Sequence, residues 1–427
     1  MKFQQLRGMK LGAASASAQI EGGDVAHNWN EWADKGHIKD GSSPRRANDH
    51  FARWREDIDL MHDMGITIYR LSIEWARVEP DDNAFDEEAI EYYKTLLRYA
   101  REKGIEPLVT LHHFTHPIWF ERRGGFMKKA NIAIFLRYVQ HVVRELGDLC
   151  HEYVTINEPN VFATMGYLGG GFPPGLSSIL GAGRVMSVLA ACHIQAYKLI
   201  HTTREQLGFR DTRVGFAHHM RVFRAQNPKS PFQRICTRVA RHWFQNSVSS
   251  AYLIGHFGIP LRNYSGVRPG EYSDFLALNY YTTTVVGGLR EGREPNSPRN
   301  DLDWEIYPEG IAECAKELYR LLPRPIYITE NGTCDNEDAY RARYIAEHLE
   351  ALLDSNLPVE RYYHWCFTDN FEWLDGESAR FGLVHVDYET QARTIKRSGA
   401  FYRDLIQEDA MTEALYQRYI KDQTYPT

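Results

Sequence analysis

The sequence predicts an α/β protein, specifically a single (β/α)8 barrel of the TIM type. Short runs rich in β-branched, leucine and aromatic residues alternate with longer helical patterns, which indicates parallel strands joined by helical crossovers. Eight such units occur over 427 residues, and that number fits a closed barrel better than an open sheet. No low-complexity linker and no short repeat divides the chain, so we expect one domain over residues 1–427.

Each expected strand is short and is bounded by turn or polar residues. In chain order the strands are Met9–Ala14, Thr67–Ile73, Glu106–Leu111, Tyr153–Ile156, Arg213–Ala217, Phe275–Tyr280, Pro325–Thr329 and Glu360–Trp365. The clearest helices between them are Ala47–Met64, Glu87–Lys103, Ile132–Leu146, Val185–Leu207 and Ala339–Ser355. In Glu87–Lys103 apolar residues recur on one helical face from Ile90 to Ala100, and Gly104 follows as a stop signal.

The charge and the composition exclude some classes of partner. The chain has 50 Lys and Arg against 56 Asp and Glu, a net charge of −6, so it offers no general basic stripe for a phosphate backbone and no nucleic acid is expected. No apolar run is long enough to span a membrane. The 9 Trp, 25 Tyr and 20 Phe are many for a chain of this size, and they suit both a deep core and stacking surfaces for sugar rings.

The cysteines and the N-terminus indicate a reducing compartment. The six cysteines are scattered without a C-x-x-C pair, which argues against a zinc ribbon, a thioredoxin-type site or a dense disulfide framework. Small residues at 14–18 look like a cleavage site, but the preceding residues 1–10 are polar and form no apolar stretch of a signal peptide. We therefore expect a cytoplasmic protein.

Residues able to do chemistry gather at the carboxyl ends of the expected strands, where (β/α)8 barrels place their active sites. Strand 2 carries Arg70, strand 3 ends in His112-His113, and strand 4 ends in Asn157-Glu158. Glu330 ends strand 7, roughly across the barrel mouth from Glu158. Two carboxyl groups facing one pocket can cleave a glycoside, because one protonates the leaving oxygen while the other attacks or activates water. A lone glutamate at a strand end is usually a surface residue, but two of them beside the polar residues at the other strand ends favour the functional interpretation.

Several motifs in the same order resemble those of one known family. They are Gln19-Ile20-Glu21-Gly22, Tyr69 to Trp75 (YRLSIEW), Leu111 to Phe114 (LHHF), Thr155 to Pro159 (TINEP), Asp274 to Thr282 (DFLALNYYT), Ile328 to Gly332 (ITENG) and Asp369 to Trp373 (DNFEW), with Arg380-Phe381-Gly382 behind the last. Together they resemble glycoside hydrolase family 1, the retaining glycosidases of the β-glucosidase type with a (β/α)8 fold. The resemblance runs from Gly12 to about Tyr388.

The resemblance assigns a role to each motif residue. It implies that Glu158 is the acid/base and Glu330 the nucleophile, with Arg70 and Tyr281 in contact with the nucleophile. Glu158 should then have a raised pKa and hold a proton at rest, while Glu330 stays ionised. Retention requires the two carboxyl groups to lie about 5–5.5 Å apart. For the sugar, the resemblance points to Gln19, His113, Asn157, Glu372 and Trp373 as hydrogen-bonding residues and to Trp365 as the platform under the ring.

Glu372 also bears on the substrate. Relatives that act on 6-phosphorylated sugars carry a different pattern at this motif, and a carboxylate here would repel a phosphate dianion. We therefore expect an unphosphorylated β-glycoside as substrate, with β-glucosides first and β-galactosides or β-fucosides as alternatives. The mechanism needs only two carboxyl groups, so no cofactor and no metal is expected.

Three other interpretations were weighed. The pairs His112-His113 and His218-His219 could suggest a metal site, but neighbouring residues on a strand face opposite ways and no H-E-x-x-H spacing accompanies them. A transglycosidase would use the same residues as a hydrolase, so it stays open as an alternative. A catalytically weak carbohydrate-binding protein is disfavoured, because both Glu158 and Glu330 are present. The oligomeric state is left open.

Overall fold

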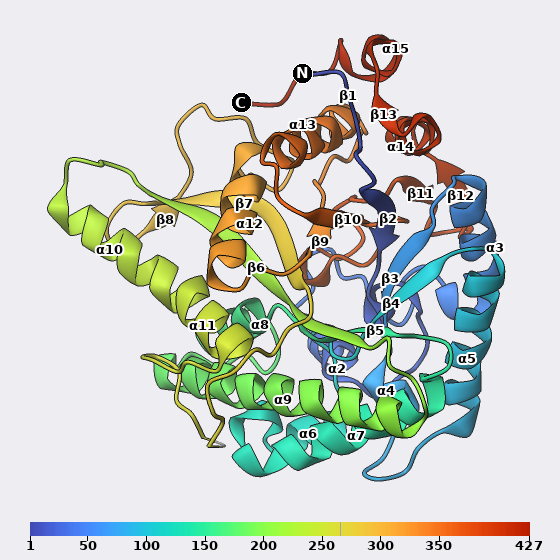
Figure 1. Cartoon of the computed structure of the whole chain (residues 1–427), viewed down its shortest axis with the longest axis vertical. Helices are drawn as coiled ribbons and strands as arrows, with labels where there is room; N and C mark the ends of the chain where they lie inside the picture. Colours follow the sequence, from blue (N-terminus) through green and yellow to red (C-terminus); the bar gives the residue numbers. More distant parts are fainter. Residues whose placement is uncertain (265) are drawn as a thin grey trace.

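The computed structural model describes residues 1–264 and 266–427, and its centre is a closed barrel of eight parallel strands. The strands follow one another around the barrel in chain order, and the pairing of the last strand with the first closes it (Figure 1). They are β2 (Lys10–Ala14), β3 (Ile68–Ser72), β4 (Glu106–Thr110), β5 (Glu152–Asn157), β6 (Arg213–Ala225), β7 (Leu276–Val286), β9 (Ile326–Asn331) and β10 (Val359–Trp365). The predicted (β/α)8 barrel is confirmed.

Helices follow every barrel strand and form the outer layer. The longer ones are α3 (His50–Asp63), α5 (Glu87–Glu102), α7 (Ile132–Leu146), α9 (Ile179–Gln206), α10 (Pro231–Arg241), α11 (Ser247–Ile254), α12 (Glu309–Leu321), α13 (Arg341–Asp354) and α14 (Arg397–Glu408). Shorter helices sit in the loops that follow β2 to β5, namely α1 (Ser17–Ile20), α2 (Asn28–Asp34), α4 (Trp75–Val78), α6 (Ile118–Arg122) and α8 (Pro159–Tyr167), while α15 (Glu413–Leu415) follows α14 near the end of the chain. Strands β1 (Gln4–Gln5) and β13 (Ala410–Met411) pair with each other and bring the two chain ends together (Figure 1).

One helix within the described residues, α9, is long and apolar enough to cross a membrane by length and composition. Of its most apolar stretch, 78% is buried inside the protein. The helix packs against α7, α8 and the strands β5 and β6, so its apolar character is accounted for by the core.

The helices and strands lie close to the ranges predicted from the sequence, but some of their ends differ. Helix α7 has the predicted limits, while α3 begins at His50 because Ala47 and Asp49 adopt positive φ angles that a helix does not tolerate. Strands β6 and β7 extend to Ala225 and Val286, well past their predicted ends. Beyond the barrel rim they pair only with each other, and β8 (Glu291–Gly292) adds to the far end of β7. The apolar pattern of a buried strand stops at the rim, so the sequence did not reveal this extension.

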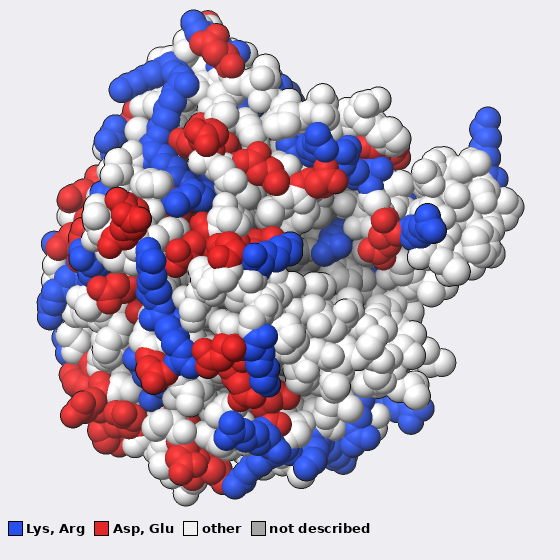
Figure 2. All heavy atoms as spheres, turned by 180° about the vertical axis from the view of Figure 1, so that it is seen from behind, with Lys and Arg blue, Asp and Glu red and all other residues white. Residues whose placement is uncertain are grey.

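The extension shapes the opening of the barrel. It carries β6 and β7 outward to α10, which lies at the side of the molecule (Figure 1). Seen from behind, the molecule has a projecting part and, beside it, a hollow in the surface (Figure 2). The barrel interior below the rim is filled by buried side chains from the strands, among them Ile68, Leu108, Val154, Tyr327 and Tyr363. A filled interior leaves only the rim open for a ligand.

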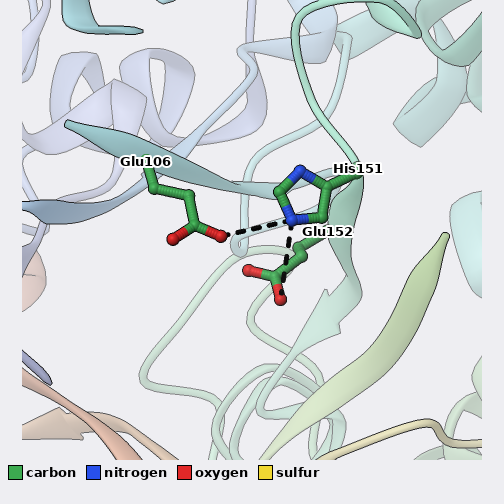
Figure 3. A group of neighbouring side chains, drawn as sticks. All are labelled: Glu106, His151 and Glu152. Atoms are coloured by element: carbon green, nitrogen blue, oxygen red, sulfur yellow. Dashed lines mark ion pairs between the residues drawn. The ribbon is translucent and has the colours of Figure 1, made fainter. Parts of the chain in front are cut away.

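At the opposite, amino-terminal end of the barrel, Glu106, His151 and Glu152 bring three potential metal ligands together (Figure 3). Cations already occupy this cluster. The Arg361 guanidinium lies 2.8 Å from Glu106 and 2.6 Å from Glu152, and Lys10 lies 3.1 Å from Glu106. Hydrogen bonds from His151 and the charge of Arg361 hold the pKa of Glu106 far below its ordinary value against the effect of burial. The arrangement fits an ion-pair network that closes the barrel floor better than a metal centre.

Replacing Arg361 by Met should destabilise the protein by about 3–5 kcal/mol, because Glu152 is buried and would lose its charged partner. Denaturant unfolding measures this loss. The control is Lys10→Met, which removes an exposed cation of the same network and should cost no more than about 1 kcal/mol. Equal effects of the two variants would contradict the assignment of Arg361 as the central cation.

Candidate active site

The rim of the barrel surrounds a pocket of about 550 Å³. It lies at the carboxyl ends of the strands, as expected for this fold. Predicted site residues from five parts of the chain line it, namely His113, Asn157, Glu158, Tyr281, Glu330, Trp365, Glu372 and Trp373. Gln19 and Arg70 lie directly beside it, because Gln19 contacts Glu372 and Arg70 contacts Glu330. The structure therefore brings all ten predicted residues together.

Glu330 projects from the end of β9 and is almost fully buried. One carboxylate oxygen accepts a hydrogen bond from Arg70 Nη1 at 2.6 Å, and the other accepts one from the Tyr281 hydroxyl at 2.6 Å. The glycine two residues on is required by packing, since a Cβ on Gly332 would lie 1.9 Å from the Trp365 carbonyl oxygen. These two donors hold the Glu330 carboxylate in an orientation that allows it to attack a ligand bound in the pocket.

Glu158 lies at the end of β5, directly before α8, and its backbone adopts φ 43° and ψ 59°. This left-handed conformation is uncommon for a residue with a side chain and is typical of functional positions. Its Oε1 atom accepts hydrogen bonds from His219 Nδ1 at 2.9 Å and from Asn279 Nδ2 at 2.9 Å. The two carboxyl groups thus have different partners, which suits different tasks.

A hydrogen-bond network joins the two halves of the site. Arg70 donates to Glu330 and also, through Nη2, to Asn157 Oδ1 at 2.7 Å. Asn279 Nδ2 donates to the same Asn157 oxygen at 3.0 Å and to Glu158 at 2.9 Å. Because every link is buried, the network fixes the relative positions of Glu158 and Glu330.

Burial and neighbouring groups act on both carboxyl groups. Burial raises the pKa of Glu330 to about 7, although Arg70 and Tyr281 act in the opposite direction. Burial also acts to raise the pKa of Glu158, but His219 and Asn279 act against it and lower that pKa. Because the two buried carboxylates repel each other, the charge of one favours the protonated form of the other, and they share a proton as a pair. The sequence did not reveal the two donors to Glu158.

Two of the glycone residues predicted from the motifs carry buried polar atoms that are not paired within the described chain. Gln19 donates from Nε2 to the Phe371 carbonyl at 2.8 Å, which leaves its buried Oε1 without a partner among the described residues. His113 Nε2 accepts from Asn157 Nδ2 at 3.0 Å, so its proton is on Nδ1, which is likewise buried and unpartnered in the part of the chain that the structure describes. A buried free acceptor and a buried free donor are suited to sugar hydroxyls.

Aromatic rings form the wall behind these polar atoms. His113 stacks on Trp365 at 5.6 Å and 26° and on Trp373 at 6.0 Å and 27°. Trp373 also packs against Trp29 at 4.7 Å, which anchors it to the core. Flat apolar faces next to hydrogen-bonding groups match a sugar ring, whose C–H face is apolar and whose edge is polar.

Three residues of the site were not predicted: His219, Arg221 and Asn279. His219 and Arg221 lie on the outer part of β6, and both line the pocket. The His218-His219 pair was noticed in the sequence only as a possible metal site. Its two members do face opposite ways, since His218 bonds the Ser249 hydroxyl at 3.1 Å on the helix side while His219 contacts Glu158. The signal that could have found His219 was its position at a strand end opposite Glu158.

The fold and the site define a class of protein: a (β/α)8 barrel with two buried carboxyl groups facing a sugar-sized pocket at its rim, as in the glycosidases. The profile of Glycosyl hydrolase family 1 matches residues 6–411, and the chain belongs to that family. It is a glycosyl hydrolase, and the family resemblance inferred from the motifs is confirmed.

The similar proteins agree with this assignment. The chain is 29% identical to Beta-glucosidase A of Thermotoga maritima, over 95% of this chain and 98% of that protein. It is 26% identical to the Beta-galactosidase of Saccharolobus solfataricus, over 95% and 96% of the two chains. Among solved structures, the beta-glycosidase from Pyrococcus horikoshii superposes with a TM-score of 0.88 at 31% identity, covering 98% of both chains. The beta-glucosidase from Thermotoga maritima in complex with glucoimidazole has a TM-score of 0.86 at 28% identity, covering 95% of this chain and 99% of that one.

Proposed function

We propose that this protein is a retaining exo-β-glycosidase that hydrolyses unphosphorylated β-glycosides, β-glucosides first and β-galactosides or β-fucosides as alternatives. The observation that carries the proposal is the pair Glu158 and Glu330, each buried at the rim and each held by its own donors. The names of the related β-glucosidase and β-galactosidase and the glucoimidazole complex support the same substrate class. The almost fully buried glycone residues support removal of a terminal sugar, because a long chain could not pass through such a pocket.

In the first step the Glu330 carboxylate attacks the anomeric carbon while the Glu158 carboxyl group transfers its proton to the glycosidic oxygen. A C–O ester bond to Glu330 forms, the bond to the aglycone breaks, and the aglycone leaves as an alcohol. One proton shared between the two carboxyl groups is the stoichiometry this step needs. Positive charge developing at the anomeric carbon favours the ionised form of Glu330 and leaves the proton on Glu158.

In the second step water replaces the aglycone. Glu158, now a carboxylate, removes a proton from the water molecule as its oxygen attacks the anomeric carbon. The ester bond to Glu330 breaks, and the free sugar forms with its original β configuration. Arg70 and Tyr281 stabilise the Glu330 carboxylate as it leaves, because both donate hydrogen bonds to it.

The charge of Glu372 alone does not account for the proposed exclusion of phosphorylated sugars. Burial raises the pKa of Glu372 to about 8, so this group is mostly protonated at neutral pH in the ligand-free site and repels a phosphate less than expected. Lys39, which lines this pocket, is already paired with Asp375 at 2.6 Å. A 6-phosphate would therefore find no unpaired cation in this part of the described chain, and burying a dianion without one is costly.

Initial rates of the purified protein on p-nitrophenyl β-glucoside, β-galactoside, β-fucoside and 6-phospho-β-glucoside test the proposal. We expect turnover of the neutral sugars and a kcat/KM for the phosphorylated one that is lower by at least about 100-fold. Turnover of the phosphorylated glucoside alone would overturn the substrate class. A first-formed product with inverted configuration at its anomeric carbon would overturn the retaining mechanism.

Other properties of the proposed enzyme follow from the same evidence. We propose a single catalytic domain over residues 1–427, which is supported by the family match to residues 6–411. A cytoplasmic location is supported by six free cysteines, five of them buried. We propose no nucleic-acid partner, since blue and red side chains alternate on the face in Figure 2 without a broad basic area. The proposed reaction uses no cofactor or metal.

A further inference from the structure

A chain of hydrogen bonds leads from the outer pocket to Glu158. Arg221 Nε lies 3.1 Å from His219 Nε2, and His219 Nδ1 lies 2.9 Å from Glu158 Oε1. The Arg221 guanidinium also lies over the Phe244 ring, 4.9 Å from its centre, and makes no ion pair with any carboxylate of the described chain. The mechanism described above uses neither His219 nor Arg221.

This contact fixes the proton of the imidazole. A guanidinium can only donate, so His219 Nε2 must present its lone pair to Arg221. Its other nitrogen, Nδ1, then carries the hydrogen and donates it to Glu158 Oε1. Two aromatic rings hold the imidazole in this position: Tyr281 stacks on it at 5.9 Å and 19°, and Phe244 meets it edge-on at 5.7 Å.

Asn279 acts on the same carboxyl oxygen. Its Oδ1 accepts a hydrogen bond from the Thr329 hydroxyl at 2.6 Å, so its amino group faces Glu158 and donates to Oε1 at 2.9 Å. Oε1 therefore accepts from two fixed donors. A protonated Glu158 has only Oε2 left to carry its hydrogen, and Oε2, which has no hydrogen-bond partner among the described residues, is the oxygen left to meet a ligand.

We propose that His219 and Arg221 are positioning residues for Glu158: they direct its proton to Oε2 and stabilise the carboxylate that remains after the proton has been transferred. The inference rests on the proposed function and adds to it, because neither residue needs to touch the sugar. Arg221 acts through His219, whose other tautomer would turn a lone pair toward Glu158 in place of a hydrogen.

The carboxyl group of Glu158 also responds to other groups around it, and a test must keep them unchanged. The titratable and charged groups around it are His219 and Arg221 on β6, Arg70 on β3, Tyr281 on β7, Glu330 on β9 and Glu372 after β10. His218 on β6 lies near it as well, but its ring turns away toward the Ser249 hydroxyl. Substitutions at 219 and 221 leave the remaining five in place.

The test compares His219→Phe, which keeps a ring but removes the donor, with His219→Asn, whose amide can donate from nearly the same place as Nδ1. Arg221→Met removes the donor that fixes the tautomer of His219. His218→Phe serves as the control, because the ring of His218 faces the helices. For His219→Phe we expect kcat/KM on phenyl β-glucoside to fall by roughly 10-fold to 100-fold and much less on 2,4-dinitrophenyl β-glucoside. The alkaline limb of the pH profile should move to higher pH, since the carboxylate loses a donor.

We expect His219→Asn to recover most of the kcat/KM and most of the wild-type pH profile. Arg221→Met should shift the alkaline limb in the same direction as His219→Phe but by less. His218→Phe should leave the alkaline limb unchanged. A folded His219→Phe protein with an unchanged limb and unchanged dependence on the leaving group would overturn the inference. If that variant does not fold, Arg221→Met decides the question in the same way.

A measurement without turnover separates this inference from the proposed function. Carbon-13 NMR of protein labelled at the glutamate carboxyl carbons, with the Glu158 signal assigned through Glu158→Gln, follows its titration directly. A Glu158 titration that moves to higher pH in His219→Phe supports the inference even if no glycoside is hydrolysed. A titration that does not move overturns it even if the enzyme is fully active.

Discussion

Replacing Glu330 by glycine should lower kcat on p-nitrophenyl β-glucoside by roughly 10⁴-fold or more, because no other group can form the covalent intermediate. The fold should survive the change. Arg70, which loses a charged partner, keeps hydrogen bonds to Asn157 Oδ1 at 2.7 Å and to the Thr110 hydroxyl at 3.0 Å. Circular dichroism of the variant checks that the barrel is intact.

A direct measurement of the intermediate sharpens this prediction. A 2-deoxy-2-fluoro-β-glucoside with an activated leaving group should label the wild-type chain, and mass spectrometry should find the label in the peptide that contains Glu330. A matched control is Glu121→Gln, which removes a carboxylate that pairs with His116 away from the pair and should leave labelling unchanged. Labelling of any other residue, or appreciable turnover by Glu330→Gly once contamination is excluded, would remove Glu330 as the nucleophile.

Much of this site could be predicted because its residues belong to short motifs at strand ends. Asn157 and Glu158 are neighbours, and two residues after Glu330 comes Gly332, the glycine that the approach of the Trp365 backbone requires. The alternation of strands and helices was also readable, since buried parallel strands leave continuous apolar runs. Local sequence therefore determined both the barrel and the position of the two carboxyl groups on its rim.

What the sequence did not show depends on contacts between distant segments. The donors to Glu158 come from β6 and β7, 61 and 121 residues further along the chain, and both act to lower the pKa of Glu158. The outer part of β6 was missed for a related reason. Its residues are half-buried, and Arg221 and Arg224 interrupt the apolar run expected of a barrel strand, although this part pairs with β7 along its length.

Replacing Glu158 by alanine should affect glycosides according to their leaving groups. A poor leaving group such as methanol or phenol needs the proton from Glu158, so its kcat/KM should fall by about 10²–10⁴-fold. A 2,4-dinitrophenolate leaves without a proton, and the first step on its β-glucoside should be nearly unchanged. The glycosyl-enzyme would then accumulate, because the same variant lacks the base that activates water in the second step.

Azide distinguishes this pattern from a general loss of activity. A small anion needs no base and fits the space that the side chain leaves, so it should attack the intermediate, restore turnover of 2,4-dinitrophenyl β-glucoside and yield the β-glycosyl azide. The same anion should not rescue Glu330→Gly with that product, since a direct displacement at a β-glycoside gives the α-azide. Equal losses on good and poor leaving groups, measured on the first step, would count against Glu158 as the acid. Because the two variants are predicted to fail at different steps and to give azides of opposite configuration, one pair of experiments assigns both roles.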